Sequence, residues 1–133
     1  VEGGGVAAVV NSEIIPMREF RRALEAEQRQ FGEAWNSFPA AQRRMFERRM
    51  RERTLDSLIA TEVLYQSASR HGFYTSDLAV RDQVISTSFF QEDGRFSKEA
   101  YLRLLEANAW TPKTYEAYVR RQVTLGEVRD SFI

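Results

Sequence analysis

Few side chains in this 133-residue sequence have the type and setting needed for catalysis or metal binding. Cysteine is absent, and the single histidine, His71, precedes Gly72 at the expected end of a helix. A cation near a helix C-terminus is favourable by itself, which accounts for His71 without a catalytic role. The carboxylates are mostly interleaved with arginines, and Glu92-Asp93-Gly94 lacks the alternating oxygen ligands of a calcium loop. We therefore predict no catalytic residue, no metal site and no cofactor.

A run of arginines is the strongest concentration of charge. Its members are Arg43, Arg44, Arg48, Arg49, Arg51 and Arg53. Glu47 and Glu52 lie four residues from members of the run, so weak ion pairs on a solvated helix face are one interpretation. The other is a basic rim that attracts acidic segments of a polypeptide or anionic lipid headgroups. Nucleic acid is not expected as a partner, because the whole chain carries 19 basic and 19 acidic residues.

A set of aromatic and methionine side chains lies beside the arginine run. It consists of Phe31, Trp35, Phe38, Met45, Phe46 and Met50. Packing in a core is the default interpretation for such a set. The alternative is an exposed groove that binds polypeptide, because flexible thioethers and flat rings adapt to many sequences. The neighbouring arginines favour this alternative, so we predict these six residues as a polypeptide-binding site with the arginines as its basic rim.

The elements that position these residues are mainly helical. Residues 1–5 are expected to form a flexible lead and residues 6–133 a single domain. Apolar residues on both sides of Asn11-Ser12-Glu13 predict a short N-terminal β-hairpin. The apolar pattern from about Pro39 to His71 predicts one long central helix, closed by Gly72 as a C-cap glycine. Four further helices, about five in all, are expected to begin near Pro16, Ser76, Ser97 and Thr111.

Four segments, in chain order, resemble the N-terminal domain of the SurA/PpiD family of periplasmic peptidyl-prolyl isomerases. They are the valine strand, turn and isoleucines of 9–15, the aliphatic stripe of 58–68, the Gly-Phe-Tyr-Thr-Ser-Asp helix restart of 72–77, and the Phe-Gln-Glu-Asp-Gly-Arg-Phe segment of 90–96 followed by Tyr101. The last segment is closer to PpiD than to SurA. Ser12 departs from the family pattern, which favours glycine there, and a type I′ turn needs positive φ at that position.

This resemblance implies a function as well as a SurA N-terminal-domain-like fold. It implies a periplasmic module of the chaperone type that binds unfolded, partly folded or nascent envelope polypeptides. The module would be the non-catalytic part of a peptidyl-prolyl isomerase family protein, with a parvulin domain downstream of Ile133 and an inner-membrane anchor upstream of Val1 as its expected neighbours. Contact with the membrane is expected only through that outside segment. The alternative expectation is a homodimerisation or docking module that assembles the parent protein at the inner membrane through exposed apolar surface.

Overall fold

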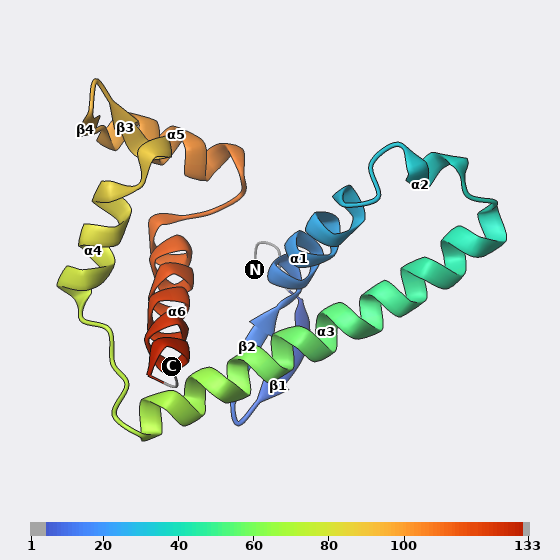
Figure 1. Ribbon diagram of the computed structural model, residues 1–133, viewed down its shortest axis with the longest axis horizontal. Helices are drawn as coiled ribbons and strands as arrows, with labels where there is room; N and C mark the ends of the chain where they lie inside the picture. Colours follow the sequence, from blue (N-terminus) through green and yellow to red (C-terminus); the bar gives the residue numbers. More distant parts are fainter. Residues whose placement is uncertain (1–4, 132–133) are drawn as a thin grey trace. The chain divides into compact units, whose positions relative to one another are not determined.

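The computed structural model describes residues 5–131 and is mainly helical, as predicted (Figure 1). Most of the predicted lead, residues 1–4, lies outside the described residues. The elements are β1 (Val6–Val10), β2 (Glu13–Pro16), α1 (Met17–Arg29), α2 (Ala34–Ser37), α3 (Ala40–Arg70), α4 (Asp77–Ser86), the 3-10 helix η1 (Ser88–Phe90), β3 (Gln91–Glu92), β4 (Arg95–Phe96), α5 (Lys98–Ala107) and α6 (Pro112–Asp130). The described residues form six α-helices, one more than the five expected, because the short α2 lies between α1 and the long helix α3.

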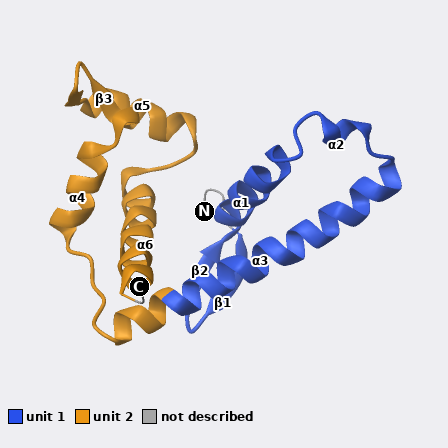
Figure 2. Cartoon of the chain, in the orientation of Figure 1, with its two compact units in different colours: residues 1–64 blue, residues 65–133 orange. Residues whose placement is uncertain are grey.

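The chain divides into two compact units, residues 1–64 and 65–133, with the boundary inside α3 (Figure 2). Whether residues 6–133 unfold as one domain stays a prediction.

The N-terminal hairpin of the first unit forms where the sequence places it. Strands β1 and β2 pair antiparallel, with Val9 opposite Ile14 and Val10 opposite Glu13. Asn11 has φ of 49° and Ser12 has φ of 75°, which are the signs that a type I′ turn requires. Ser12 therefore occupies a left-handed conformation that is sterically costly for a residue with a Cβ atom. Val10 and Ile15 are buried, as is Met50 of α3, so one face of the hairpin contributes buried apolar side chains to this unit.

The long helix α3 ends as its sequence predicts. Gly72 has φ of 89°, and the N–H of Phe73 donates to the carbonyl of Ala68 at 3.0 Å while that of Gly72 donates to Ser69 at 3.2 Å. These two bonds form a Schellman motif, which satisfies carbonyls that the helix end leaves without partners. The glycine at this position avoids the strain that a Cβ atom would bring, so the prediction of a C-cap glycine is confirmed.

The second unit has the larger apolar core, formed by α4, η1, α5 and α6. Its buried members are Val80, Val84, Phe90, Tyr101, Leu105 and Val119. The rings of Phe90 and Tyr101 meet edge to face with centroids 4.9 Å apart, a favourable aromatic geometry. Each predicted cap is present: Ser76 accepts from the N–H of Ala79, Ser97 from that of Ala100, and Thr111 forms a capping box with Thr114. The caps fix where these helices begin.

Two buried threonines connect the segment that precedes α4 to α6. The hydroxyls of Thr75 and Thr124 lie 2.7 Å apart, and the two residues are 2% and 1% exposed. Beside them, the Arg120 guanidinium donates to the carbonyl of Thr75 and to the carboxylate of Asp77. This polar contact joins residues that are 49 positions apart in sequence, and it thereby fixes the path of the chain between α3 and α4 in the second unit.

The buried Tyr101 has a polar contact of its own. Its hydroxyl donates to a carboxylate oxygen of Glu116 at 2.9 Å. Burial raises the pKa of Tyr101 well above its usual value, and the hydrogen bond to Glu116 and the negative charge of that residue raise it further. The folded second unit therefore favours the neutral phenol.

Candidate polypeptide-binding site

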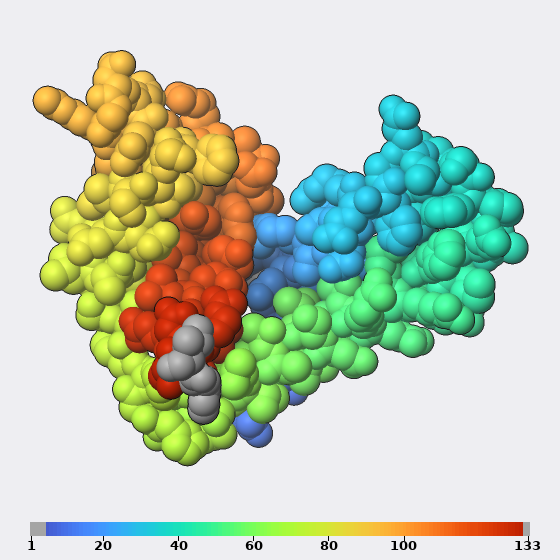
Figure 3. All heavy atoms as spheres, in the orientation of Figure 1, coloured from blue at the N-terminus to red at the C-terminus, as the bar shows by residue number. Residues whose placement is uncertain are grey.

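The predicted aromatic set gathers around the connection between α1 and α3, at the end of the first unit farthest from the hairpin (Figure 1). Gly32 has φ of 55°, a conformation that suits glycine in the turn after α1. Phe38 is extended, with φ of −74° and ψ of 142°, as expected for a residue that precedes proline. These backbone features turn the chain twice within ten residues, and α2 lies between the two turns. The space-filling view shows atoms of this connection at the molecular surface (Figure 3).

Four rings from this connection and from α3 form a contiguous cluster. The ring centroid of Phe31 is 5.5 Å from that of Trp35 and 6.1 Å from that of Phe38. Phe46, on the second turn of α3, stacks on Phe31 at 6.2 Å and meets Phe38 edge to face at 5.3 Å. All four side chains are half-buried. The ring cluster of Phe31, Trp35, Phe38 and Phe46 thus holds the connection together and still exposes aromatic surface.

The two methionines of the set lie in different environments. Met50 is 2% exposed and belongs to the core of the first unit. Met45 is 45% exposed, one residue before Phe46 of the ring cluster. Of the two, only Met45 offers a flexible apolar side chain that a bound polypeptide could contact without a rearrangement.

A shallow hollow of about 420 Å³ lies against Trp35. Its lining consists of Glu25, Gln28, Arg29, Gly32, Trp35 and Asn36. Gln28 and Arg29 lie three and four residues after Glu25 in α1, so both are neighbours of Glu25 on the helix surface. That spacing is the signal in the sequence that could have identified these lining residues. Trp35 is the member shared by the hollow and the ring cluster, which makes it the residue where a client side chain could contact both.

The arginines of the predicted rim divide into one structural residue and five exposed ones. Arg43 is half-buried and donates to the carbonyls of Asn36 at 3.3 Å and Phe38 at 3.1 Å. Its guanidinium satisfies backbone acceptors at the end of α2, a role that the sequence analysis did not assign. The exposed members are Arg44, Arg48, Arg49, Arg51 and Arg53.

The expected ion pairs within α3 do not form among the described residues. Neither Glu47 nor Glu52 lies within 4.0 Å of a rim arginine there. Arg53 instead approaches Glu27 of α1 at 4.0 Å, where both side chains are largely exposed and the pair stabilises little. The exposed arginines are therefore available to an acidic partner, and their attraction to it would be weakened by salt.

The single histidine, His71, directly follows α3. The Nδ1 atom of His71 lies 2.8 Å from the carbonyl of Ser67, within the last turn of α3. Residues 5–131 contain no group of three or more side chains placed to hold a metal ion. Within the same residues, no helix has the length and apolar character to cross a membrane. The geometry around the ring cluster suits non-covalent binding of apolar and acidic polypeptide.

Known proteins resemble this chain along nearly its whole length. The family described as the SurA-like N-terminal domain matches residues 1–129. The periplasmic chaperone PpiD of Escherichia coli (strain K12) is 29% identical over 126 residues, which cover 92% of this chain and 20% of that protein. PpiD of Haemophilus ducreyi (strain 35000HP / ATCC 700724) is 26% identical over 137 residues, covering 98% and 22% respectively. The chain thus spans about a fifth of the length of these relatives. No solved structure matches it. The match over 129 residues shows that the chain belongs to the SurA-like N-terminal domain family.

Proposed function

We propose that this chain is a periplasmic module of the chaperone type that binds unfolded, partly folded or nascent envelope polypeptides at the ring cluster and its basic rim. Two relatives are named periplasmic chaperones, and the family match includes every residue of the candidate site. In this proposal the module takes no part in catalysis. An isomerase domain and an inner-membrane anchor belong to other segments of the parent protein.

The observation that carries the proposal is the half-buried state of the ring cluster beside the exposed Met45. A core would bury such rings, whereas here four of them present surface at one end of the first unit. Apolar area of this kind stabilises a bound chain by about 25 cal/mol for each Å² removed from water. The hollow against Trp35 gives a client side chain a place to enter. Because the ring cluster and the shallow hollow impose no particular sequence on a client, binding would be weak, reversible and tolerant of sequence.

The exposed arginines add a preference for acidic clients. They concentrate positive charge on the first half of α3, next to the ring cluster, in a chain with no net charge. Attraction by such charges acts mainly on the rate of association and falls with ionic strength. Acidic segments of a client are therefore expected to reach the ring cluster faster than basic segments.

A single substitution at Trp35 tests the site. The wild-type chain and Trp35→Ala are compared in suppressing aggregation of a chemically unfolded protein, with circular dichroism to confirm that both remain helical. Loss of one aromatic contact and its buried area is expected to weaken binding by about tenfold. Phe89→Ala is the matched control, because Phe89 is an aromatic residue of the second unit that is 79% exposed. Equal activity of wild type and Trp35→Ala would refute the assignment of the site.

A charge-matched pair of triple variants tests the rim. Changing Arg44, Arg48 and Arg51 to Gln should slow the association of the chain with an acidic unfolded client at low salt. The control changes three exposed arginines of the second unit, Arg81, Arg95 and Arg129, to Gln, which alters net charge equally. Equal rates for the two triple variants would show that net charge matters and the rim does not.

The alternative function is a module that dimerises or docks the parent protein at the inner membrane. The exposed apolar side chains of the hairpin favour it, because exposed apolar surface is typical of interfaces, and two of them, Val9 and Ile14, lie opposite each other in the β1-β2 pair. Sedimentation equilibrium distinguishes the two functions. A stable dimer without any affinity for unfolded protein in the aggregation assay would favour the alternative and exclude the chaperone proposal.

A further inference from the structure

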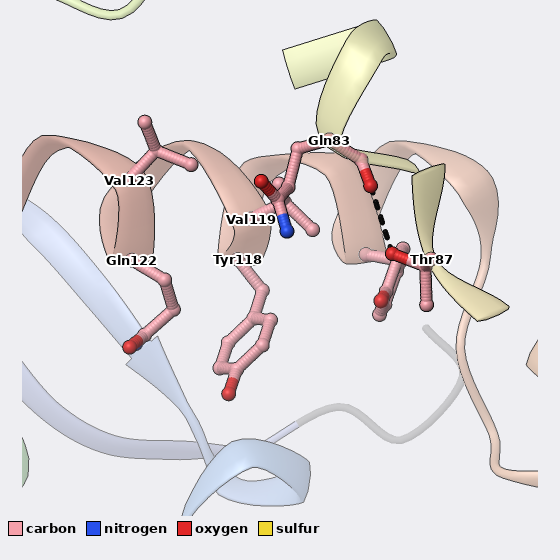
Figure 4. Close-up of a pocket in the computed structure, with 7 residues that line it drawn as sticks. Gln83, Thr87, Tyr118, Val119, Gln122 and Val123 are labelled. Atoms are coloured by element: carbon pink, nitrogen blue, oxygen red, sulfur yellow. Dashed lines mark hydrogen bonds between the residues drawn. The ribbon is translucent and has the colours of Figure 1, made fainter. Parts of the chain in front are cut away.

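A second hollow lies wholly within the second unit, between the end of α4 and α6, and has a volume of about 330 Å³ (Figure 4). Gln83 and Thr87 line it from α4 and its C-cap, and the remaining lining residues belong to α6. These are Tyr115, Tyr118, Val119, Gln122 and Val123. None of the seven residues carries a charge at neutral pH, so an ionic ligand has nothing here to pair with. The volume lies near the lower end of the range for ligand sites, roughly 300–1,000 Å³, and suits a short segment.

Aromatic rings form one side of this hollow. Tyr118 is 41% exposed, and its ring centroid is 6.2 Å from that of Tyr115 and 5.3 Å from that of Trp110. Trp110 and Tyr115 are themselves 5.5 Å apart. Each of the three rings therefore contacts the other two, and Tyr118 presents the most exposed surface of the three.

Side-chain amides complete the lining. Figure 4 shows Tyr118 and Gln122, one helical turn apart, projecting from the same side of α6. Gln83 reaches the hollow from α4, and its backbone carbonyl accepts a hydrogen bond from the hydroxyl of Thr87 at 2.8 Å. Over residues 5–131, the side-chain amides of Gln83 and Gln122 make no hydrogen bond. Each amide therefore has N–H groups to donate to a ligand.

The composition of the hollow distinguishes among the common modes of peptide recognition. Strand addition needs a free sheet edge, and both walls here belong to helices. A bound amphipathic helix needs a continuous apolar groove, which the amides interrupt. A polyproline II segment has carbonyls that make no internal hydrogen bonds, and it packs its rings on flat aromatic surfaces. The exposed Tyr118 ring and the donating amides of Gln83 and Gln122 meet both of these needs.

We propose that the hollow between α4 and α6 binds a short, uncharged, proline-rich segment of polypeptide in the polyproline II conformation. The rings of Tyr118 and Tyr115 pack against pyrrolidine rings, and the amides of Gln83 and Gln122 donate to backbone carbonyls of the segment. Proline lacks an N–H, so the ligand brings no donor that the hollow would leave unsatisfied. This site is separate from the ring cluster of the first unit, and the proposal does not rest on the proposed function.

Fluorescence anisotropy of a labelled decaproline peptide with the 133-residue chain tests the proposal. Saturable binding is expected, with no binding of a Gly-Ser repeat peptide of equal length. Tyr118→Ala should weaken the binding about fivefold to tenfold, the loss expected from one aromatic contact, whereas Tyr118→Phe keeps the ring and the affinity. Gln122→Ala, an exposed position that carries little risk to folding, should weaken it about threefold to tenfold. Leu102→Ala, at a residue as exposed as Tyr118, is the control without effect.

Three results would overturn the proposal. They are the absence of saturable decaproline binding, an affinity for decaproline no higher than that for the Gly-Ser peptide, and equal affinities of wild type, Tyr118→Ala and Gln122→Ala for decaproline. A dimer that Tyr118→Ala dissociates and that decaproline does not perturb would assign the hollow to a second copy instead. Trp35→Ala should leave decaproline affinity unchanged, so this proposal and the proposed function can fail separately.

Discussion

The buried contact between Thr75 and Thr124 predicts an unusual order of stabilities among three variants. Changing either threonine to valine keeps the shape of the side chain and removes one hydroxyl. The remaining hydroxyl then lies in a site that is almost closed to water, since the two residues are 2% and 1% exposed. Changing both threonines removes both polar groups together. The double variant should therefore be more stable than at least one of the single variants.

The magnitudes follow from what each remaining hydroxyl can reach. Thr75 lies outside a helix, so after Thr124→Val its hydroxyl has no carbonyl of a preceding turn to bond, and the loss should be about 2 kcal/mol. Thr124 lies inside α6 and can donate to the carbonyl four residues earlier, so Thr75→Val should cost only about 1 kcal/mol. The double variant should cost about 1 kcal/mol or less, which gives a coupling free energy of about 2 kcal/mol.

Urea unfolding followed by circular dichroism measures this cycle, with an unchanged m-value as the sign that the denatured state is comparable. A double variant whose loss equals the sum of the single losses would refute the reasoning. Such additivity would mean that the two hydroxyls do not depend on each other, and that the contact does not hold α6 to the segment before α4.

Three further predictions concern backbone strain and ionisation. Ala109 follows α5 with φ of 58° in a second Schellman motif, so Ala109→Gly should stabilise the chain by about 1 kcal/mol in urea unfolding. Ala107→Gly, inside the helix, should instead destabilise the chain by about 1 kcal/mol. Equal effects of the two substitutions would contradict this prediction. Ser12→Gly should raise the free energy of unfolding by up to about 1 kcal/mol through the same relief of strain, and a loss would show that the turn is not strained. The raised pKa of Tyr101 means that the unfolded chain releases this proton first, near pH 10, so stability holds below about pH 10 and falls above it. Tyr101→Phe should flatten that fall in pH-dependent thermal unfolding, and an unchanged slope would exclude Tyr101 as its source.

Much of the fold could be predicted because its signals are local. Gly72, Ser76, Ser97 and Thr111 mark helix ends by chemistry that acts within four residues, and each of them caps a helix as expected. The contact of Thr75 with Thr124 could not be predicted, because it joins residues 49 positions apart and neither has an unusual local pattern. Helix α2 was missed because four residues are too few for a periodic signal.

The sequence indicated which residues make up the candidate site, but it did not indicate how deeply each of them is buried. Aromatic spacing indicated that Phe31, Trp35, Phe38 and Phe46 would meet, but periodicity does not say how deeply a side chain is buried. Met50 lies in the core although Met45, five residues earlier, is exposed. Arg43 likewise resembles its neighbours in sequence, and only the turn of the backbone at Phe38 brings carbonyls to its guanidinium. The role of the ring cluster as a binding surface stays a prediction.

The most direct test of the central claim is to place a photo-crosslinking amino acid at Met45, beside the ring cluster, and separately at Leu102 in the second unit. The two positions have similar exposure, 45% and 41%, so they differ mainly in their surroundings. Irradiation with an unfolded envelope protein should give strong crosslinks from position 45, weak ones from position 102, and none from either with the same protein folded. Equal crosslinking at both positions, or none at position 45, would contradict the assignment of polypeptide binding to the ring cluster.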